Sequence, residues 1–141
     1  MRALKVIAPL LLLFTSYVQA AEHKVHLTLK GGHLYIPCSI GGHGHECLLD
    51  TGATISVIDD RLYLGASPVT GTVDEVFVGG NHAGKLVRII VEIGGAEVEI
   101  NAAAIKLRPE IEIDIIIGED VLSRLKSVLI DYKNKVVVFE D

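Results

Sequence analysis

An apolar stretch of this chain ends in a single carboxylate. Residues 47–49 (Cys-Leu-Leu) lead directly into Asp50, and Thr51, Gly52 and Ala53 follow it. An ionised aspartate beside an apolar strand is costly unless it is hydrogen-bonded or placed where its charge is used. Gly52 allows the backbone to approach the carboxylate with its N–H, and the Thr51 hydroxyl can lock the loop. The pattern indicates either a carboxylate poised for chemistry or an aspartate that caps an ordinary turn.

Histidines are the other side chains with possible ligand chemistry. His43 and His45 flank Gly44 and precede Glu46, a spacing that can hold Zn²⁺ or Cu²⁺ in an exposed turn. The turn is rich in glycine and no further ligand set is evident, so we interpret it as a solvated loop. No metal site is predicted.

Composition limits the classes of protein to consider. The chain has 141 residues, of which 50% are hydrophobic and 22% charged, which fits one globular domain. The formal net charge is −5, whereas nucleic-acid-binding proteins usually carry an excess of basic residues, so this class is disfavoured. Fourteen glycines and 5% aromatic residues favour an all-β domain with many turns and an aliphatic core.

Alternating hydrophobic residues predict strands through most of the chain. In Lys24–Lys30, residues 25, 27 and 29 are apolar while residues 26 and 28 are polar, the period of a half-buried strand. Paired strands around glycines or Lys133-Asn134 predict hairpins. The predicted strand pairs are 34–40 with 45–50, 76–78 with 85–87, 87–93 with 98–100, and 128–132 with 136–139.

Helix is scarce in the predicted structure. The best candidate is Asp120–Lys126, where Val121, Leu122 and Leu125 share one face. The predicted architecture is a small closed or nearly closed β barrel with one short helix near the C-terminus.

The first twenty residues have the pattern of a secretory signal peptide. Arg2 and Lys5 precede the apolar run Val6–Phe14, and Val18-Gln19-Ala20 supplies the small-x-small pattern before a cut. The run is shorter than the roughly 20 residues of a membrane span. We therefore expect a signal peptide at 1–20, a domain at 21–141 that is free of the membrane after cleavage, and an exported location, either periplasmic or secreted.

The expected exported location bears on whether the two cysteines form a disulfide. In an oxidising compartment Cys38 and Cys47 could pair. A hairpin with a four-residue turn at 41–44 would place them directly opposite each other. Two reduced thiols packed as small apolar residues are the equally weighted alternative.

Two motifs together resemble the signatures of one protein family. Asp50-Thr51-Gly52-Ala53 resembles the active-site loop of the retropepsin-like aspartic proteases, the retroviral proteases and their bacterial relatives. The segment 115–122, with Ile116, Ile117 and Gly118 at its centre, resembles the family's second signature, an aliphatic run and a glycine that enter a short helix. The resemblance covers residues 24–140 and implies the small retropepsin-like barrel for residues 21–141.

The resemblance also implies a homodimeric peptidase. Pepsin-like enzymes carry two Asp-Thr-Gly loops in one chain, whereas this chain carries one. Other aspartates lack a following Thr/Ser-Gly, namely Asp59, Asp60, Asp114 and Asp131. A catalytic pair then requires Asp50 from each of two chains related by a twofold axis. The two Asp50 carboxylates would share one proton and activate a water against a peptide bond, without metal or organic cofactor.

Further roles follow from the same resemblance. Thr51 is expected to bond across the dimer, Gly52 and Ala53 to support the loop beside the peptide, and Val78, Gly79 and Gly80 to form the tip of a flap over an extended peptide or protein substrate. An ordinary surface hairpin is the alternative for the flap segment. For the whole protein, the alternative is a non-catalytic exported β module that binds peptides or a partner protein, or a structural subunit of the cell envelope.

Overall fold

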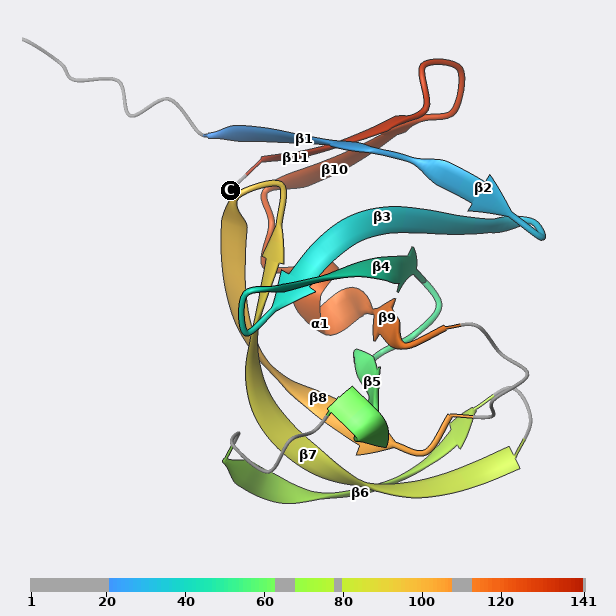
Figure 1. Ribbon diagram of the computed structural model, residues 1–141, viewed down its shortest axis with the longest axis vertical. Coiled ribbons are helices and arrows are strands. Elements are labelled where there is room, and N and C mark those ends of the chain that lie inside the picture. Colours follow the sequence, from blue (N-terminus) through green and yellow to red (C-terminus); the bar gives the residue numbers. More distant parts are fainter. Residues whose placement is uncertain (1–20, 63–67, 78–79, 108–112, 141) are drawn as a thin grey trace, which may run out of the picture.

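The strands of the molecule form two sheets of very different size. The computed structural model describes residues 21–62, 68–77, 80–107 and 113–140, and Figure 1 shows their arrangement. The small sheet has the order β1-β11-β10, and the large sheet has the order β2-β3-β4-β9-β5-β8-β7-β6. The elements are β1 (Glu22–His26), β2 (Thr28–Lys30), β3 (His33–Ile40), β4 (His43–Leu49), β5 (Val57–Asp59), the 3-10 turn η1 (Asp60–Leu62), β6 (Val69–Phe77), β7 (Gly80–Ile93), β8 (Ala96–Ile105), β9 (Ile115–Ile117), α1 (Glu119–Leu122), β10 (Ser127–Asp131) and β11 (Val136–Glu140).

The large sheet closes on itself. Besides its pairing with β4, β3 pairs with β7 through Ser39 opposite Glu92 and Ile40 opposite Val91. This contact joins β3, β4, β9, β5, β8 and β7 into a ring, so few strand edges remain open. The predicted all-β barrel with one short helix is confirmed.

The core is almost entirely aliphatic because the strands alternate as the sequence predicted. Along β8, Ala96, Val98 and Ile100 are buried and the residues between them are exposed, which gives the sheet one dry face. Residues from both sheets and α1 contribute to the main cluster, including Leu27, Ile36, Val91, Ile115, Val121 and Phe139. A smaller cluster formed by Val57, Ala103 and Ile105 lies on the opposite face of β5 and β8.

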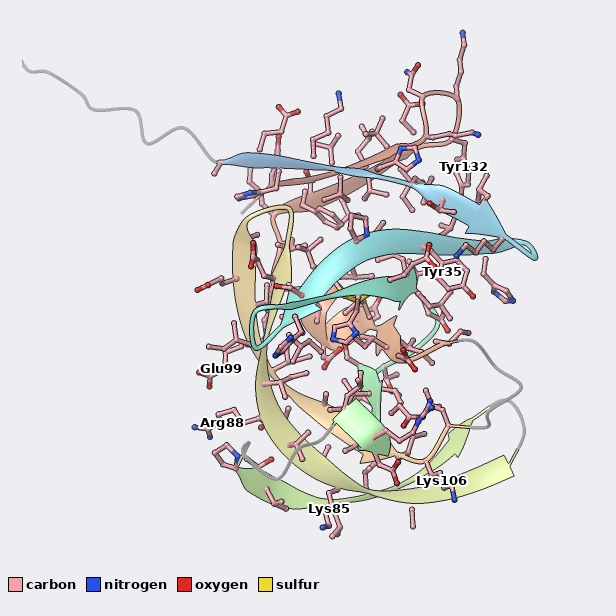
Figure 2. The ribbon with its side chains drawn as sticks, viewed as in Figure 1. Tyr35, Lys85, Arg88, Glu99, Lys106 and Tyr132 are labelled. Atoms are coloured by element: carbon pink, nitrogen blue, oxygen red, sulfur yellow. A yellow bond between two sulfur atoms is a disulfide. The ribbon has the colours of Figure 1, made fainter. Side chains whose placement is uncertain are left out.

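The outer face of β7 and β8 is polar. Arg88 lies opposite Asn101 in the ladder, and its Nε is 3.5 Å from an Oε of Glu99. Figure 2 shows both side chains on the outside of the barrel. This pair is exposed and contributes little to stability.

The turn between β3 and β4 differs from its prediction. Gly41 and Gly42, with φ of 58° and 79°, form a two-residue turn of the kind that requires positive φ at both positions. Ile40 therefore pairs with His43, and Cys38 lies opposite His45. The predicted four-residue turn and the direct Cys38–Cys47 register are wrong.

The two cysteines still meet, as diagonal rather than directly opposed neighbours. Cys47 lies opposite Ile36, two residues from Cys38 on the same face, and diagonal partners on one face are within reach of each other. The structure joins Cys38 and Cys47 in a disulfide with a Cα–Cα distance of 5.9 Å. Both residues are buried in the main cluster. The bond therefore links β3 and β4, the two strands before the Asp50 loop, on the side that faces the core.

The predicted continuous strand 24–30 is divided into two. The backbone N–H of Leu27 donates to the carbonyl of Lys135, 2.9 Å away, which continues the β1–β11 register by one residue. β1 consequently pairs with β11 in the small sheet, whereas β2 pairs with β3 in the large one. Leu27 itself is fully buried, so the chain changes sheets at a core residue.

The predicted helix is present but shorter. α1 ends at Leu122, and the N–H groups of Arg124 and Leu125 then donate to the carbonyls three residues earlier, those of Val121 and Leu122. Such tight turns are common at helix ends. In the part of the chain that the structure describes, no helix has the length and apolar character needed to cross a bilayer.

A buried carboxylate ties the end of β5 to its neighbours. Asp59 is fully buried, and Arg61 donates to it from its backbone N–H (2.9 Å), from Nε (2.6 Å) and from Nη2 (3.1 Å). The Leu107 N–H donates to the second oxygen at 3.3 Å. The Arg61 side chain holds the pKa of the Asp59 carboxyl below its ordinary value of 3.8, although burial acts in the opposite direction.

We expect Arg61→Ala to destabilise the protein in a pH-dependent way. Because the folded-state pKa of Asp59 is depressed, its stabilising contribution is fully present above the unfolded value of 3.8 and is lost as pH falls through the folded value. The melting temperature of Arg61→Ala should therefore lie well below wild type at pH 7, and the gap should shrink below pH 4. Arg88→Ala, which removes an exposed arginine from an exposed pair, is the control. Equal losses for the two variants would contradict the assigned role of Asp59.

The disulfide should contribute measurably to stability. Closing a loop with a sequence separation of 9 residues stabilises a protein by about 2–3 kcal/mol in the chain-entropy model. We expect the double variant Cys38→Ala/Cys47→Ala to lose about that much free energy of unfolding in urea. Wild type in reductant should show a similar loss, and the double variant should not respond to reductant. A wild-type mass that shows two free thiols after purification without reductant would contradict the disulfide.

Candidate active site

Asp50 lies directly beyond the end of β4, in the interior of the large sheet. β4 pairs with β3 on one side and runs parallel to β9 on the other, with Leu49 opposite Ile117. The Asp50 N–H donates to the Ile117 carbonyl at 2.9 Å, which extends the parallel ladder by one bond. The residue is half-buried. Because β4 is hydrogen-bonded to a strand on each side, its end holds the Asp50 carboxylate at the point where the chain turns.

The loop after Asp50 points a backbone donor at its own carboxylate. The Gly52 N–H donates to Asp50 Oδ1 at 2.9 Å, and the Ala53 N–H donates to the Asp50 carbonyl at 3.3 Å. A Cβ on residue 52 would lie 3.2 Å from Asp50 Oδ1, a tight contact that glycine avoids. The predicted approach of the Gly52 N–H is confirmed. Thr51 and Gly52 are exposed and Ala53 is half-buried.

The β9–α1 junction packs directly on this loop. The Glu119 N–H donates to the Ala53 carbonyl at 2.8 Å. Gly118 sits so close that a Cβ there would lie 2.7 Å from the Ala53 oxygen and 2.9 Å from the Ile55 carbonyl carbon. The structure thus brings the two sequence motifs together, and it gives a steric reason for glycine at position 118.

Two side chains that the sequence analysis did not single out for the site complete this junction. Asp120 Oδ1 accepts hydrogen bonds from the Ser56 N–H (2.8 Å) and the Ser56 hydroxyl (2.6 Å). The Ser56 hydroxyl in turn accepts from the Gly118 N–H at 3.0 Å. The available signal was a lone hydroxyl residue just before the apolar strand 57–58, and nothing in its spacing connects it with Asp120.

An apolar wall adjoins the loop. The residues Ile55, Val73, Leu107 and Ile116 are partly buried and pack against the small cluster of Val57, Ala103 and Ile105. Ile116 faces this cluster while Ile115 and Ile117 belong to the main core, as alternation along β9 requires. The second signature therefore does two things: its outer isoleucines anchor the core and its middle one contributes to the wall.

A long hairpin occupies the predicted flap position. β6 and β7 pair from Val69 to Phe77, ending with Phe77 opposite Gly80. Val78 and Gly79 of the predicted tip lie outside the described residues, and Gly80 begins β7. The arms are much longer than the predicted segments 76–78 and 85–87. In Figure 1 the part of β7 that pairs with β6 lies at the opposite end of the molecule from the β1-β11-β10 sheet, with β4 and β9 between them, whereas the other end of β7 reaches toward that sheet.

The other aspartates have separate surroundings. Asp59 and Asp114 share Arg61, with the Arg61 Nη2 3.3 Å from Asp114 Oδ1. Asp131 accepts from the backbone and side-chain nitrogens of Asn134 within a turn, at 2.9 and 2.7 Å. These contacts account for Asp59, Asp114 and Asp131 as structural groups, whereas the side chain of Asp50 accepts from a glycine N–H.

The histidine-rich turn has open surroundings. His43 is exposed and His45 half-buried at the start of β4. Within residues 21–62, 68–77, 80–107 and 113–140, no three His, Cys, Asp or Glu side chains are grouped so that they could hold a metal ion.

Comparison with known proteins identifies the fold. A retropepsin-like aspartic protease from Rickettsia conorii superposes with a TM-score of 0.56 at 18% identity, covering 86% of this chain and 94% of that one. The EIAV protease, solved with the inhibitor HBY-793, gives 0.52 at 20% identity and covers 64% of this chain and 85% of its own. The retroviral protease-like domain of Ddi1 from Leishmania major gives 0.52 at 24% identity, with 76% and 93% covered.

This chain has the retropepsin-like fold. In sequence it is 25% identical over 119 residues to DNA damage-inducible protein 1 from Yarrowia lipolytica, a match that covers 79% of this chain but only 29% of that protein. No protein-family model matches the chain. The predicted resemblance to the retropepsin-like proteins is confirmed.

In the retropepsin-like barrel, Gly118 offers a direct test of the contact between the two motifs. Gly118→Ala would force a methyl group against the Ala53 and Ile55 backbone, and such overpacking costs about 1–3 kcal/mol. Backbone strain does not contribute, since φ of residue 118 is −104°. Gly44→Ala is the matched control, because a Cβ there meets nothing within 4 Å. Urea unfolding of both variants measures the difference, and a neutral Gly118→Ala would contradict the close packing.

Proposed function

We propose that the protein is an aspartic endopeptidase that acts as a homodimer, with Asp50 from each subunit forming the catalytic pair. The observation that carries the proposal is the Asp50 carboxylate itself. It is half-buried, a glycine N–H orients it, and it lies at the motif junction of a retropepsin-like fold. The chain supplies one such loop, so a pair requires a second copy.

The reaction follows from the chemistry of two adjacent carboxyl groups. Held about 3 Å apart, they carry one proton between them because two neighbouring negative charges repel. The ionised carboxylate removes a proton from a water molecule as that water attacks the scissile carbonyl carbon. The protonated carboxyl donates its proton to the carbonyl oxygen, which gives a neutral tetrahedral intermediate. Collapse of this intermediate breaks the C–N bond, with a proton delivered to the leaving amine.

The neighbouring residues hold this arrangement. Gly52 fixes the orientation of the carboxylate through its N–H and leaves room for a substrate backbone. In the proposed dimer the hydroxyl of Thr51, which is exposed, bonds across the twofold axis to the opposite loop. The β6–β7 hairpin closes over an extended peptide by main-chain pairing. The proposed reaction requires no metal ion or organic cofactor.

We further propose that the enzyme acts outside the cytoplasm, in the periplasm or after secretion. Residues 1–20, which carry the predicted signal peptide, lie outside the described residues. The support is that pattern together with the Cys38–Cys47 disulfide, a bond that persists in oxidising compartments.

Replacement of the proposed catalytic carboxyl tests the activity. We expect Asp50→Asn to lower kcat on an unfolded protein substrate by about a thousandfold or more, because the amide supplies neither the base nor the acid. Asp60→Asn, an isosteric change at an exposed aspartate outside the loop, should leave cleavage unchanged. If purified wild type cleaves nothing between pH 3 and pH 8 that Asp50→Asn does not also cleave, a non-catalytic binding module is the better interpretation.

Mixing subunits tests the shared site. When wild-type chains refold with about a tenfold excess of Asp50→Asn chains, random pairing leaves only about one wild-type chain in ten with a wild-type partner. We expect the activity per wild-type chain to fall to about that fraction, and an excess of Asp60→Asn chains should cause no loss. Undiminished activity in the first mixture would rule out a site built from two Asp50 side chains.

A further inference from the structure

A buried carboxylate that takes no part in the proposed chemistry lies behind the Asp50 loop. Asp120 is half-buried at the start of α1, and Ser56, its partner, is 1% exposed. The two residues are joined by two hydrogen bonds across a sequence separation of 64. Both of these bonds end on Asp120 Oδ1. The carboxylate therefore holds one point on the chain, the residue at which the Asp50 loop enters β5.

Ser56 transmits this attachment in two directions. Its hydroxyl donates to Asp120 and accepts from the Gly118 N–H at 3.0 Å, so one side chain connects both motifs. Its carbonyl accepts from the Ala103 N–H at 2.8 Å, which fixes the end of the loop to β8. Movement of Ser56 would thus disturb both the β9–α1 junction at Gly118 and the contact of the loop with β8 at Ala103.

Two backbone hydrogen bonds join the same segment to the residues on either side of Gly118. The Asp50 N–H donates to Ile117 and the Glu119 N–H donates to Ala53, at 2.9 and 2.8 Å. Both partners flank Gly118, the residue that Ser56 holds. The chain of contacts from Asp120 through Ser56 and Gly118 therefore ends on the two bonds that fix the backbone of Asp50 and Ala53.

The second oxygen of Asp120 has different surroundings. Asp120 Oδ2 is buried and has no hydrogen-bond partner among the described residues. A buried acceptor without a partner is destabilising. The two bonds at Oδ1 are therefore the contacts through which Asp120 holds the loop.

We propose that Asp120 is a positioning residue for Asp50, acting through Ser56 and Gly118 to fix the loop that carries the reacting carboxylate. It touches no substrate. Its kinetic consequences rest on the proposed peptidase function, whereas its hold on the loop does not depend on that function.

Three variants separate positioning from stability. Asp120→Ala removes the acceptor for both Ser56 donors. Ser56→Ala removes the hydroxyl relay but keeps its backbone N–H bond to Asp120. Asp120→Asn keeps an oxygen for both Ser56 donors and alters only the atom that has no partner. Asp131→Ala is the control of matched type, since Asp131 also accepts one backbone and one side-chain hydrogen bond, in a turn between β10 and β11.

Kinetics and melting temperature should then diverge among the variants. We expect Asp120→Ala and Ser56→Ala to lower kcat by about tenfold to a hundredfold with KM changed by less than about threefold, because small misplacements of a reacting group have effects of this size. Asp120→Asn should keep clearly more of kcat than Asp120→Ala, whatever its melting temperature. Asp131→Ala should lower the melting temperature and leave kcat unchanged.

Hydrogen exchange tests whether Asp120 and Ser56 hold the Asp50 loop, and it does so whether or not the protein is a peptidase. Exchange of the Asp50 and Glu119 amides should accelerate about tenfold in Ser56→Ala relative to the Lys126 amide, since local opening is governed by local contacts. The Lys126 amide donates to Glu140 in the small sheet and serves as an internal reference. Uniform acceleration of all three amides, or an unchanged kcat in folded Ser56→Ala of an active enzyme, would overturn the proposal. If Asp120→Ala fails to fold, the Ser56→Ala data stand alone.

Discussion

The architecture around the candidate site depends on one contact, the docking of the β9–α1 junction on the loop that follows β4. Backbone hydrogen bonds run in both directions across this contact, from Asp50 to Ile117 and from Glu119 to Ala53. Gly118 permits it by lacking a side chain where the Ala53 oxygen would be 2.7 Å from a Cβ. Ring closure, the parallel β4–β9 pair and the aliphatic core all serve to bring these two segments into register.

Aliphatic side chains and polar groups occupy different places around that contact. The main cluster fills the interior with aliphatic side chains, while at the junction Ser56 hydrogen-bonds to Asp120 Oδ1 and accepts from the Gly118 N–H. Asp59 shows a second way to bury a carboxylate, with a guanidinium and two backbone donors. Asp50 is half-buried, and its side chain accepts from the N–H of Gly52 in its own loop.

Much of this could be predicted from the sequence because its signals are local. Alternation along β8 and the glycine pair before it specify strands and a turn without reference to distant residues. Turn length was the weak point: four candidate residues at 41–44 left the register open, and only the positive φ at Gly41 and Gly42 selects the two-residue turn. The division at Leu27 and the Ser56–Asp120 pair depend on partners far along the chain, which periodicity does not encode.

The sequence separation of 64 residues between Ser56 and Asp120 has a consequence for how the molecule acquires any activity. A nascent or partly unfolded chain that has ordered β3 and β4 still lacks the strand and turn that fix its aspartate. Contacts between distant parts of a chain form slowly, because the entropy of closing a long loop comes first. The candidate site is thus completed only when residues 115–120 have joined the barrel.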